Sequence, residues 1–369
     1  MKVLKFGGTS VGSAQRMKEV AKLITDGEQK IVVLSAMSGT TNTLVEISDY
    51  LYKKNPEGAN EIINKLEAKY KQHIDELFAT QEYKQKGLEV VKSHFDYIRS
   101  YTKDLFTLFE EKVVLAQGEL ISTAMVNFYL QECGVKSVLL PALEFMRTDK
   151  NAEPDPVYIK EKLQTQLELY PDMEIYITQG FICRNAYGEI DNLQRGGSDY
   201  TASLIGAAVN ASEIQIWTDI DGMHNNDPRI VDKTAPVRQL HFEEAAELAY
   251  FGAKILHPTC IQPAKYANIP VRLLNTMDPE APGTLISNDT EKGKIKAVAA
   301  KDNITAIKIK SSRMLLAHGF LRKVFEIFES YQTSIDMICT SEVGVSVTID
   351  NTKHLNEKIG RASCRERVS

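Results

Sequence analysis

The chain opens with the stretch MKVLKFGGTS (residues 1–10), in which a short apolar run leads directly into two glycines. Val3–Phe6 has the near-continuous apolar character of a strand that is covered on both faces of a sheet. Gly7 and Gly8 carry no Cβ, so the backbone can approach a ligand closely there, and amides at the start of a following helix favour anions. Lys5 can place a positive charge on a transferring phosphoryl group. The stretch therefore indicates a phosphate site. It lacks the spacing of a Walker A loop, and a plain strand-to-helix turn is the alternative.

Further apolar runs predict that the first strand belongs to a larger sheet. The other expected strands are Ile31–Ser35, Ser137–Leu140, Glu174–Phe181 and Ile214–Thr218. Between the second and third strands, apolar residues recur at helical intervals: Leu66, Tyr70, Ile74, Leu77, Phe78, and then Phe95, Ile98, Leu105 and Leu108. A second helix is expected at Phe242–Phe251. Strands that alternate with helices predict an α/β fold with a mainly parallel sheet.

Composition excludes several classes of protein. The 369 residues predict about two or three domains, and 43% hydrophobic with 25% charged residues is typical of a soluble globular protein. A net charge of −5 gives no reason to expect a nucleic-acid partner. The five cysteines form no CxxC pair, which argues against a zinc site or a disulfide framework. No signal peptide is recognisable, and no apolar run approaches the roughly 20 residues that span a bilayer. We therefore expect a cytoplasmic protein with no membrane segment.

A change of pattern near Pro279–Gly293 predicts a linker and a second domain, because Pro, Gly, Asn, Asp and Lys gather there. Beyond it we expect a half-buried strand, an amphipathic helix and two strands: Ile304–Ile309, Gly319–Tyr331, Ile335–Cys339 and Val343–Ile349. This order opens a ferredoxin-like unit, and only Thr352–Ile359 could supply the rest. The expected domains are 1–287 and 288–359. Residues 360–369 (GRASCRERVS) show no periodicity, so we exclude them from the fold as a disordered tail or an artefact.

Two polar motifs follow expected elements of the first domain. Residues 35–42 (SAMSGTTN) suit carboxylate or phosphate contacts at the carboxyl end of a strand, where open α/β sheets bind ligands. The alternative is an ordinary capped loop. Residues 117–122 (QGELIS) place Glu119 at an expected helix start. That acid either complements the helix dipole or accepts the ammonium group of a substrate.

Residues 195–201 (RGGSDYT) are the more specific signal. Arg195 is suited to bidentate recognition of a carboxylate, and Asp199 could orient groups or a metal-bound water ahead of a small-residue helix at Ala202–Val209. A structural loop is the alternative interpretation.

Two later motifs suit a nucleotide. Residues 217–219 (WTD) and 227–229 (DPR) offer acids and an arginine for ribose and phosphate contacts, although turn formation explains some of the same residues. Residues 251–258 (FGAKILHP) place Lys254 beside a glycine. This lysine either caps a helix or reaches a nucleotide phosphate.

Taken in order, the motifs KFGGTSV, VVLSAMSGTTN, QGELIS, TQGFI, RGGSDYTA, WTDIDG with DPR, and FGAKILHP resemble those of the aspartate kinase family in the amino acid kinase superfamily. The resemblance covers residues 1–287 and continues to about residue 350. It implies a three-layer αβα amino acid kinase fold. It also implies MgATP-dependent phosphorylation of the β-carboxylate of L-aspartate to 4-phospho-L-aspartate, the first step toward lysine, threonine and methionine.

The resemblance also implies roles for individual residues. Lys5 would stabilise charge on the transferring phosphoryl group, and Asp199 would organise the catalytic centre. Glu119 would bind the substrate ammonium and Arg195 the α-carboxylate. The other substrate contacts would be Ser35, Thr41, Phe181 and Ser198. The contacts to ATP would be Gly7, Gly8, Thr218, Asp219, His224, Arg229 and Lys254. His224 stands where many relatives have Tyr. Mg²⁺ would accompany ATP, and no residue is assigned as a metal ligand.

The region after the linker resembles an ACT regulatory module that is only partly present. It implies lysine or threonine as an effector and a homodimer where the module is intact. Candidate effector contacts are Met314, Gly319, Phe320, Leu321, Ile335, Asp336, Ser341 and Glu342. Ala317 stands where relatives often have Ser, and an ACT fold that binds no ligand is an open alternative.

Two competing functions are open. One is another amino acid kinase, acting on glutamate, carbamate or a nucleoside monophosphate, and the combined QGE, RGGSDYT and FGAK motifs disfavour it. The other is a catalytically silent amino-acid sensor, and the retention of Lys5, Glu119, Arg195 and Asp199 disfavours that.

Overall fold

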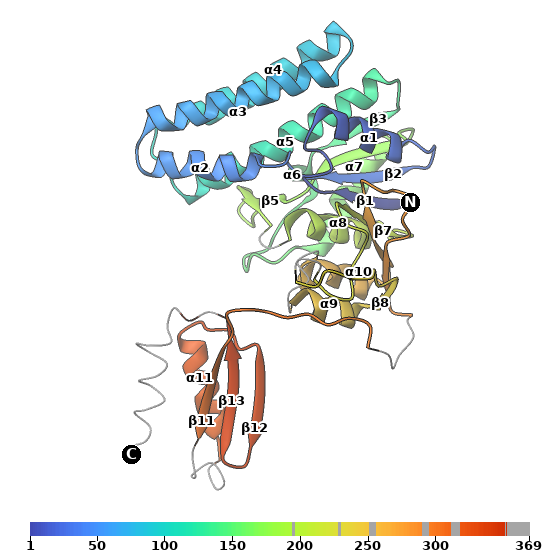
Figure 1. Ribbon diagram of the computed structural model, residues 1–369. Coiled ribbons are helices and arrows are strands. Elements are labelled where there is room, and N and C mark those ends of the chain that lie inside the picture. Colours follow the sequence, from blue (N-terminus) through green and yellow to red (C-terminus); the bar gives the residue numbers. More distant parts are fainter. Residues whose placement is uncertain are drawn as a thin grey trace. The chain divides into compact units, whose positions relative to one another are not determined.

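A computed structural model describes residues 1–193, 196–227, 230–250, 256–289, 295–310, 318–350 and 352 (Figure 1). These residues form two compact units, one within Met1–Ala299 and one that begins at Ala300. The assignments that fall outside the described residues are Arg195, Arg229, Lys254, Met314, Ala317, residues 353–359 and the 360–369 tail.

The first unit is built on a sheet of eight strands in the order β3-β4-β2-β1-β7-β9-β10-β8. All neighbouring strands are parallel except β9 and β10. The strands are β1 (Lys2–Phe6), β2 (Lys30–Leu34), β3 (Ser137–Leu140), β4 (Ile175–Gln179), β7 (Ile214–Thr218), β8 (Gln239–His241), β9 (Val271–Asn275) and β10 (Thr284–Ser287). The prediction of a mainly parallel sheet is confirmed.

Helices cover both faces of this sheet, because successive residues of its buried strands point to opposite sides. On β1, Leu4 and Phe6 belong to one hydrophobic core and Val3 belongs to the other. The first core holds side chains from α1 (Ala14–Ile24), α2 (Thr40–Tyr52), α3 (Pro56–Leu77), α4 (Gln81–Ser100) and α5 (Leu108–Glu132). The second holds side chains from α6 (Ala142–Phe145), α7 (Pro156–Glu168), α8 (Gly197–Ala208), α9 (Phe242–Tyr250) and α10 (Gln262–Tyr266). The result is the expected three-layer αβα arrangement (Figure 1).

We expected no segment long and apolar enough to span a bilayer. Helix α5 corrects this expectation, because its length and composition would allow it to cross a membrane. However, 72% of its most apolar window is buried inside the unit. That position is typical of a core helix.

Several elements differ from the predicted ones, most by one to a few residues at an end. The strand expected at Glu174–Phe181 ends at Gln179, because Phe181 has a φ of 69°, which a strand cannot continue. After it, β5 (Ile182–Arg184) pairs with β6 (Ile190–Asn192) in a separate two-stranded sheet. The expected linker contains β10, whose Thr284 and Ile286 are buried in alternation.

The single helical stretch divides into α3, α4 and α5. Leu105 lies between α4 and α5, and 74% of it is exposed. A capping box formed by Thr107 and Glu110 then starts α5.

The second unit has the predicted β-α-β-β order, with β11 (Thr305–Lys310), α11 (Phe320–Ser330), β12 (Met337–Ser341) and β13 (Gly344–Ile349). Its strands lie in the order β11-β13-β12, and both neighbouring pairs are antiparallel. The core of this unit consists of Val324, Phe328, Val345, Val347 and Ile349. β11 alternates between half-buried and exposed residues, as predicted.

Candidate active site

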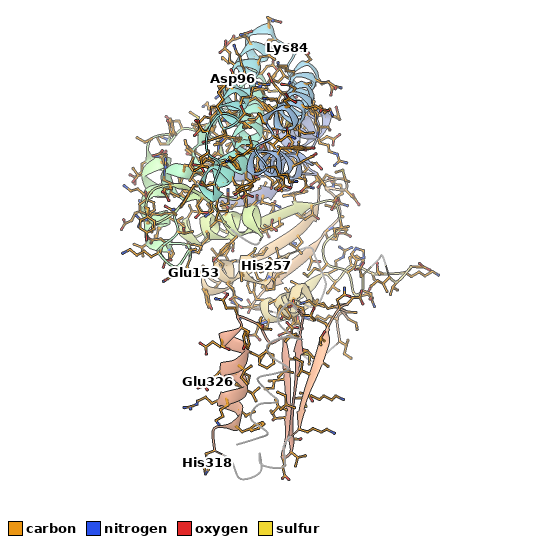
Figure 2. The ribbon with its side chains drawn as sticks, turned by 90° about the vertical axis from the view of Figure 1, so that its left-hand side faces the viewer. Lys84, Asp96, Glu153, His257, His318 and Glu326 are labelled. Atoms are coloured by element: carbon orange, nitrogen blue, oxygen red, sulfur yellow. The ribbon has the colours of Figure 1, made fainter. Side chains whose placement is uncertain are left out.

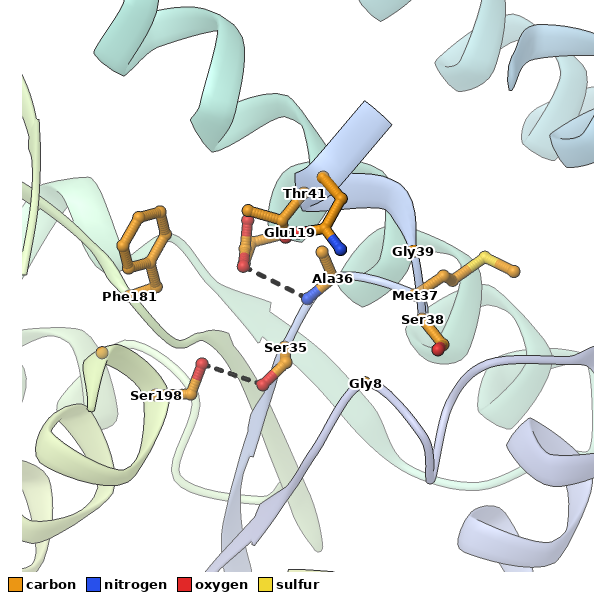
Figure 3. Close-up of a pocket in the computed structure, with 12 residues that line it drawn as sticks. Gly8, Ser35, Ala36, Met37, Ser38, Gly39, Thr41, Glu119, Phe181 and Ser198 are labelled. Carbon is orange, nitrogen blue, oxygen red and sulfur yellow. Dashed lines mark hydrogen bonds between the residues drawn. The ribbon is translucent and has the colours of Figure 1, made fainter. Parts of the chain in front are cut away.

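A cavity of about 370 Å³ lies at the carboxyl ends of three adjacent strands, β1, β2 and β4 (Figure 3). It is lined by Gly8, residues 35–39, Thr41, Asn42, Glu119, Phe181, Gly197 and Ser198. Ligands of open α/β sheets bind at this edge. The predicted substrate residues Ser35, Thr41, Glu119, Phe181 and Ser198 all face this one cavity, although they are far apart in the sequence.

Lys5 and Asp199 form an ion pair beside the cavity. The Nζ of Lys5, on β1, lies 2.6 Å from the Oδ1 of Asp199, and the two side chains are 11% and 15% exposed. Asp199 belongs to the first turn of α8, which begins at Gly197 rather than at the expected Ala202. A Cβ on Gly7 would lie 3.5 Å from the Lys5 Nζ. The structure thus brings both predicted catalytic residues and the glycine turn together.

Glu119 lies near the middle of α5, so the expected helix start at this residue is wrong. The capping box at Thr107, well before the QGE motif, determines where the helix begins. Glu119 is 3% exposed, and its Oε1 accepts a hydrogen bond from the Ala36 amide at 3.3 Å (Figure 3). Its Oε2 has no hydrogen-bond partner among the described residues. Burial raises the pKa of this carboxyl group to about 8, because the charged form loses its hydration.

A buried polar network fixes the turn of α5 that carries Glu119. The Ser122 hydroxyl donates to the Ser35 carbonyl at 2.8 Å. The Thr123 hydroxyl donates to the Glu119 carbonyl at 2.8 Å and accepts from the Gln179 amide, also at 2.8 Å. The helix is thereby bonded to residues at the ends of β2 and β4. Our sequence analysis missed Ser122, Thr123 and Gln179. A Ser–Thr pair one turn after a glutamate in an apolar helix was the available signal.

Close backbone approach explains the second glycine of the RGGSD motif. A Cβ on Gly197 would lie 2.6 Å from the ring of Phe181, so only glycine allows α8 to begin against that ring. The Phe181 amide donates to the Thr201 hydroxyl at 3.1 Å. The Ser35 hydroxyl donates to the Ser198 hydroxyl at 2.9 Å (Figure 3). The start of α8 is therefore held against β2 and the turn after β4.

Three of the described nucleotide candidates, Thr218, Asp219 and His224, lie on the other side of Lys5, whereas Gly8 lines the cavity itself. Thr218 ends β7, which neighbours β1 on the side away from β2. The Thr218 hydroxyl accepts from the Ile220 amide at 3.2 Å, and Asp219 is exposed. Farther along, His224 shares a 2.7 Å hydrogen bond with Thr234. Because β1 lies between β2 and β7, Lys5 separates the cavity from this second group. The described residues contain no cluster of three or more His, Cys, Asp or Glu side chains suited to a metal ion.

The effector candidates divide between the two ends of the second unit. β11 and β12 each pair antiparallel with β13, so they are parallel to each other and α11 must begin at the carboxyl end of β11. Figure 2 shows His318, just before α11, at one end of the unit and Glu326 farther along. Gly319, Phe320 and Leu321 therefore share an end with Ser341 and Glu342.

Ile335 and Asp336 lie at the opposite end of β12. The Asp336 amide donates to the Thr348 carbonyl at 2.8 Å, near the end of β13. Asp336 and Ser341 are thus separated by about 17 Å of strand. Within one copy of the chain, the two groups cannot contact the same small effector.

Comparison with known proteins agrees with this geometry. The model of the amino acid kinase family matches residues 1–275. The lysine-sensitive aspartokinase 3 of Escherichia coli is 36% identical over 355 residues, which cover 95% of this chain and 78% of that protein. The chain belongs to the aspartokinases of the amino acid kinase family. Aspartokinase 1 of Arabidopsis thaliana, a chloroplastic protein, is 38% identical over 95% of the chain. The chain spans 63% of the length of that plant aspartokinase.

Solved aspartokinase structures have the same fold. Aspartokinase III of E. coli in complex with aspartate and ADP superposes with a TM-score of 0.82 at 34% identity, covering 95% of this chain and 79% of the other. The same enzyme in complex with lysine and aspartate gives a TM-score of 0.78 at 33% identity, covering 99% and 82%. Both coverages include the second unit of this aspartokinase chain.

Proposed function

We propose that this aspartokinase-family chain transfers the γ-phosphoryl group of ATP to the β-carboxylate of L-aspartate, which yields 4-phospho-L-aspartate and ADP. The observation that carries the proposal is the buried, incompletely bonded carboxyl of Glu119, which faces the cavity beside the Lys5–Asp199 pair. A related aspartokinase with a TM-score of 0.82 was solved with aspartate and ADP. This reaction would be the first step toward lysine, threonine and methionine.

The cavity residues match the functional groups of aspartate. Glu119 would bind the ammonium group, and the hydroxyls of Ser35, Thr41 and Ser198 would donate to carboxylate oxygens. Phe181 would close the apolar side. From its sequence motif we assign Arg195 to the α-carboxylate. The volume of about 370 Å³ lies within the range of small-molecule sites.

Positioning and charge stabilisation are what the chain supplies to the reaction. The β-carboxylate is an anion at neutral pH, so no general base is needed for its attack on the γ-phosphorus. As the bond to phosphorus forms, the bond to the β–γ bridging oxygen breaks and ADP leaves with that oxygen. Lys5 would stabilise the negative charge on the transferring group, and Asp199 would hold Lys5 in place.

The nucleotide would lie next to Lys5, against Gly7 and Gly8 and, on the side away from the cavity, against Thr218, Asp219 and His224. Arg229 and Lys254 would contact its phosphates. MgATP supplies the phosphoryl group. A Mg²⁺ ion carried mainly by phosphates and water fits the donor set, because such ions seldom use an all-protein cage and the described residues offer none.

The second unit would serve regulation, with lysine or threonine as effector. An E. coli relative was solved with lysine, and the order of elements is that of the ACT opening. We extend the proposal to a homodimer formed through this region and to a cytoplasmic location. We also propose a catalytic domain at residues 1–287 and a regulatory domain at residues 288–359.

An aspartate-dependent ADP-release assay tests the proposal. It is run with ATP and Mg²⁺ in the presence and absence of lysine and of threonine. Glutamate, carbamate and a nucleoside monophosphate replace aspartate in parallel reactions. ADP release with aspartate alone supports the proposal. Release with another acceptor would reassign the substrate, and binding of lysine without any turnover would indicate a silent sensor.

A further inference from the structure

The proposed function does not explain how the buried carboxyl group of Glu119 and a negatively charged substrate can share one cavity. The substrate brings two carboxylates and one ammonium, so it carries a net negative charge. If Glu119 were also charged, its carboxylate would repel this substrate before the ammonium group could reach it. Glu119 is 3% exposed, receives one long hydrogen bond from Ala36, and has an oxygen without a partner among the described residues.

No charged group on the neighbouring described elements is placed to neutralise Glu119. Lys5 of β1 is paired with Asp199 of α8. From α3, Tyr70 bonds to Thr40 at 3.0 Å, and burial raises the pKa of its hydroxyl, so it stays neutral. From α4, His94 bonds to Gln117 at 2.6 Å, and burial lowers the pKa of its ring, so it is neutral above pH 7.

Several other charged groups of elements that contact α5 have partners of their own. Among them are Asp191 of β6 with Lys112, Lys30 of β2 with Asp26, Lys18 of α1 with the Glu76 carbonyl, and Glu111 of α5 itself with Tyr52. Glu46 and Asp49 of α2 and Lys92 of α4 are exposed on the surface. Among the described residues, Glu119 is thus buried without a counter-charge, which favours the neutral acid.

We propose that Glu119 is protonated in the free enzyme and releases its proton to solvent when aspartate binds, so that the ammonium–carboxylate pair forms only with an α-amino substrate. The proposal rests on the function proposed above. Charge is conserved: the neutral acid loses one H⁺, and the carboxylate left behind pairs with the substrate ammonium. Neutral Glu119 then adds no negative charge that would repel the incoming dicarboxylate, and the ammonium–carboxylate pair formed on binding is neutral overall.

Isothermal titration calorimetry of the full chain with L-aspartate tests this directly. Titrations at pH 7 in buffers of different ionisation enthalpy give the number of protons released per aspartate bound. A carboxyl group with a pKa of about 8 predicts the release of about 0.9 proton. Dissociation constants measured from pH 6 to pH 9 should show binding about tenfold weaker at pH 6 than at pH 7, with little change above pH 8.

Two controls isolate Glu119. Succinate, which has both carboxylates and no ammonium, should bind weakly and release no proton. Glu67→Gln changes a carboxyl group that is also largely buried but is paired with Lys71 and Arg99, and it should leave the proton count at its wild-type value. Glu119→Gln should lose the pH dependence of aspartate binding. Aspartate binding without proton release in the wild type would overturn the proposal.

A measurement without substrate separates this inference from the proposed function. In the unfolded chain Glu119 has its ordinary pKa, whereas in the folded chain the pKa is raised, so the native state holds one more proton near pH 7. Raising the pH from 5 to 8 should therefore lower the free energy of unfolding of the wild type relative to Glu119→Gln. Equal slopes in the two proteins would contradict the inference. Failure of aspartate to bind while the slopes differ would instead contradict the proposed function.

Discussion

Lys5 and Asp199 show how much the site depends on single side chains. The pair is largely buried and connects the first strand of the chain to a helix almost two hundred residues later. In such a position an ion pair is held in one geometry and is only weakly screened by salt. Removal of either partner would leave the other as an unpaired charge beside the substrate cavity. The same reasoning applies to Glu119, whose neutral form is tolerated there and whose charged form needs the substrate.

Lys5→Ala should lower kcat by at least about 100-fold, because it removes the positive charge next to the transferring phosphoryl group. The coupled ADP assay measures the rate, and circular dichroism checks that the fold is intact. Lys2→Ala is the matched control, since Lys2 lies on the same strand in an exposed pair with Glu28, and its kcat should be close to the wild-type value. Near-normal turnover by Lys5→Ala would remove Lys5 from the mechanism.

Arg195→Ala should mainly raise the KM for aspartate, because a bidentate contact to the α-carboxylate would be lost. Steady-state kinetics with aspartate varied at saturating ATP measures the change, and the KM for ATP serves as the internal reference. An unchanged aspartate KM would exclude Arg195 from the substrate site.

At the scale of elements, α5 is the part on which the cavity depends. It carries Glu119, it is bonded through Ser122 and Thr123 to the ends of β2 and β4, and its Gly118 lies against the loop after β2. A Cβ on Gly118 would lie 2.8 Å from the Cβ of Ala36 and 3.1 Å from the Cγ2 of Thr40. The helix and the loop can therefore approach this closely only with glycine at that position.

Gly118→Ala sets two effects against each other. Alanine favours the helix by up to about 1 kcal/mol, whereas the forced contact with the loop costs about 1–3 kcal/mol. We expect the contact to dominate, so the free energy of unfolding should fall and the aspartate KM should rise. Denaturant titration and steady-state kinetics measure the two changes. A more stable variant with an unchanged KM would show that the loop moves aside without consequence.

At the scale of the whole molecule, the described residues form two units with separate hydrophobic cores. The core of the second unit is small and consists of Val324 and Phe328 of α11 and three residues of β13. None of these residues belongs to the two cores around the large sheet. The described residues that line the substrate cavity all belong to the first unit.

Phe328→Ala should therefore unfold or loosen the second unit while it leaves the first intact. Loss of a buried phenylalanine costs about 3–5 kcal/mol, which is large for so small a core. Calorimetry or hydrogen exchange should show the loss in residues after 300, and kcat without effector should stay within a fewfold of the wild-type value. Phe95→Ala, in the first unit, is the contrasting variant and should reduce kcat and stability together. Parallel loss of kinase activity in Phe328→Ala would show that the units depend on each other.

Much of the fold and the site follows from local patterns. The strands at Ser137–Leu140 and Ile214–Thr218 were predicted with the boundaries that the structure has, because buried parallel strands are short apolar runs. The order β11-α11-β12-β13 was readable for another reason, because β11 alternates between half-buried and exposed residues and α11 has an apolar face. The motifs indicated which residues carry chemistry, since glycine pairs, a lysine before a turn and an acid after a double glycine are local features.

Only the tertiary structure determined which of these residues lie together in one cavity. Glu119, Phe181 and Ser198 reach the cavity that Ser35 lines because β1, β2 and β4 are neighbours in a sheet whose order differs from the order of the sequence. Burial of Glu119, which raises its pKa, depends on packing from several helices and cannot be read from QGELIS. The strand β10 was mistaken for a linker because its pairing partners, Val271–Leu273 and residues 239–241, lie outside its own segment. The sequence alone thus determined many of the elements and the chemical groups, whereas long-range packing determined the remaining edge strands and the distances, burial and charge of the site residues.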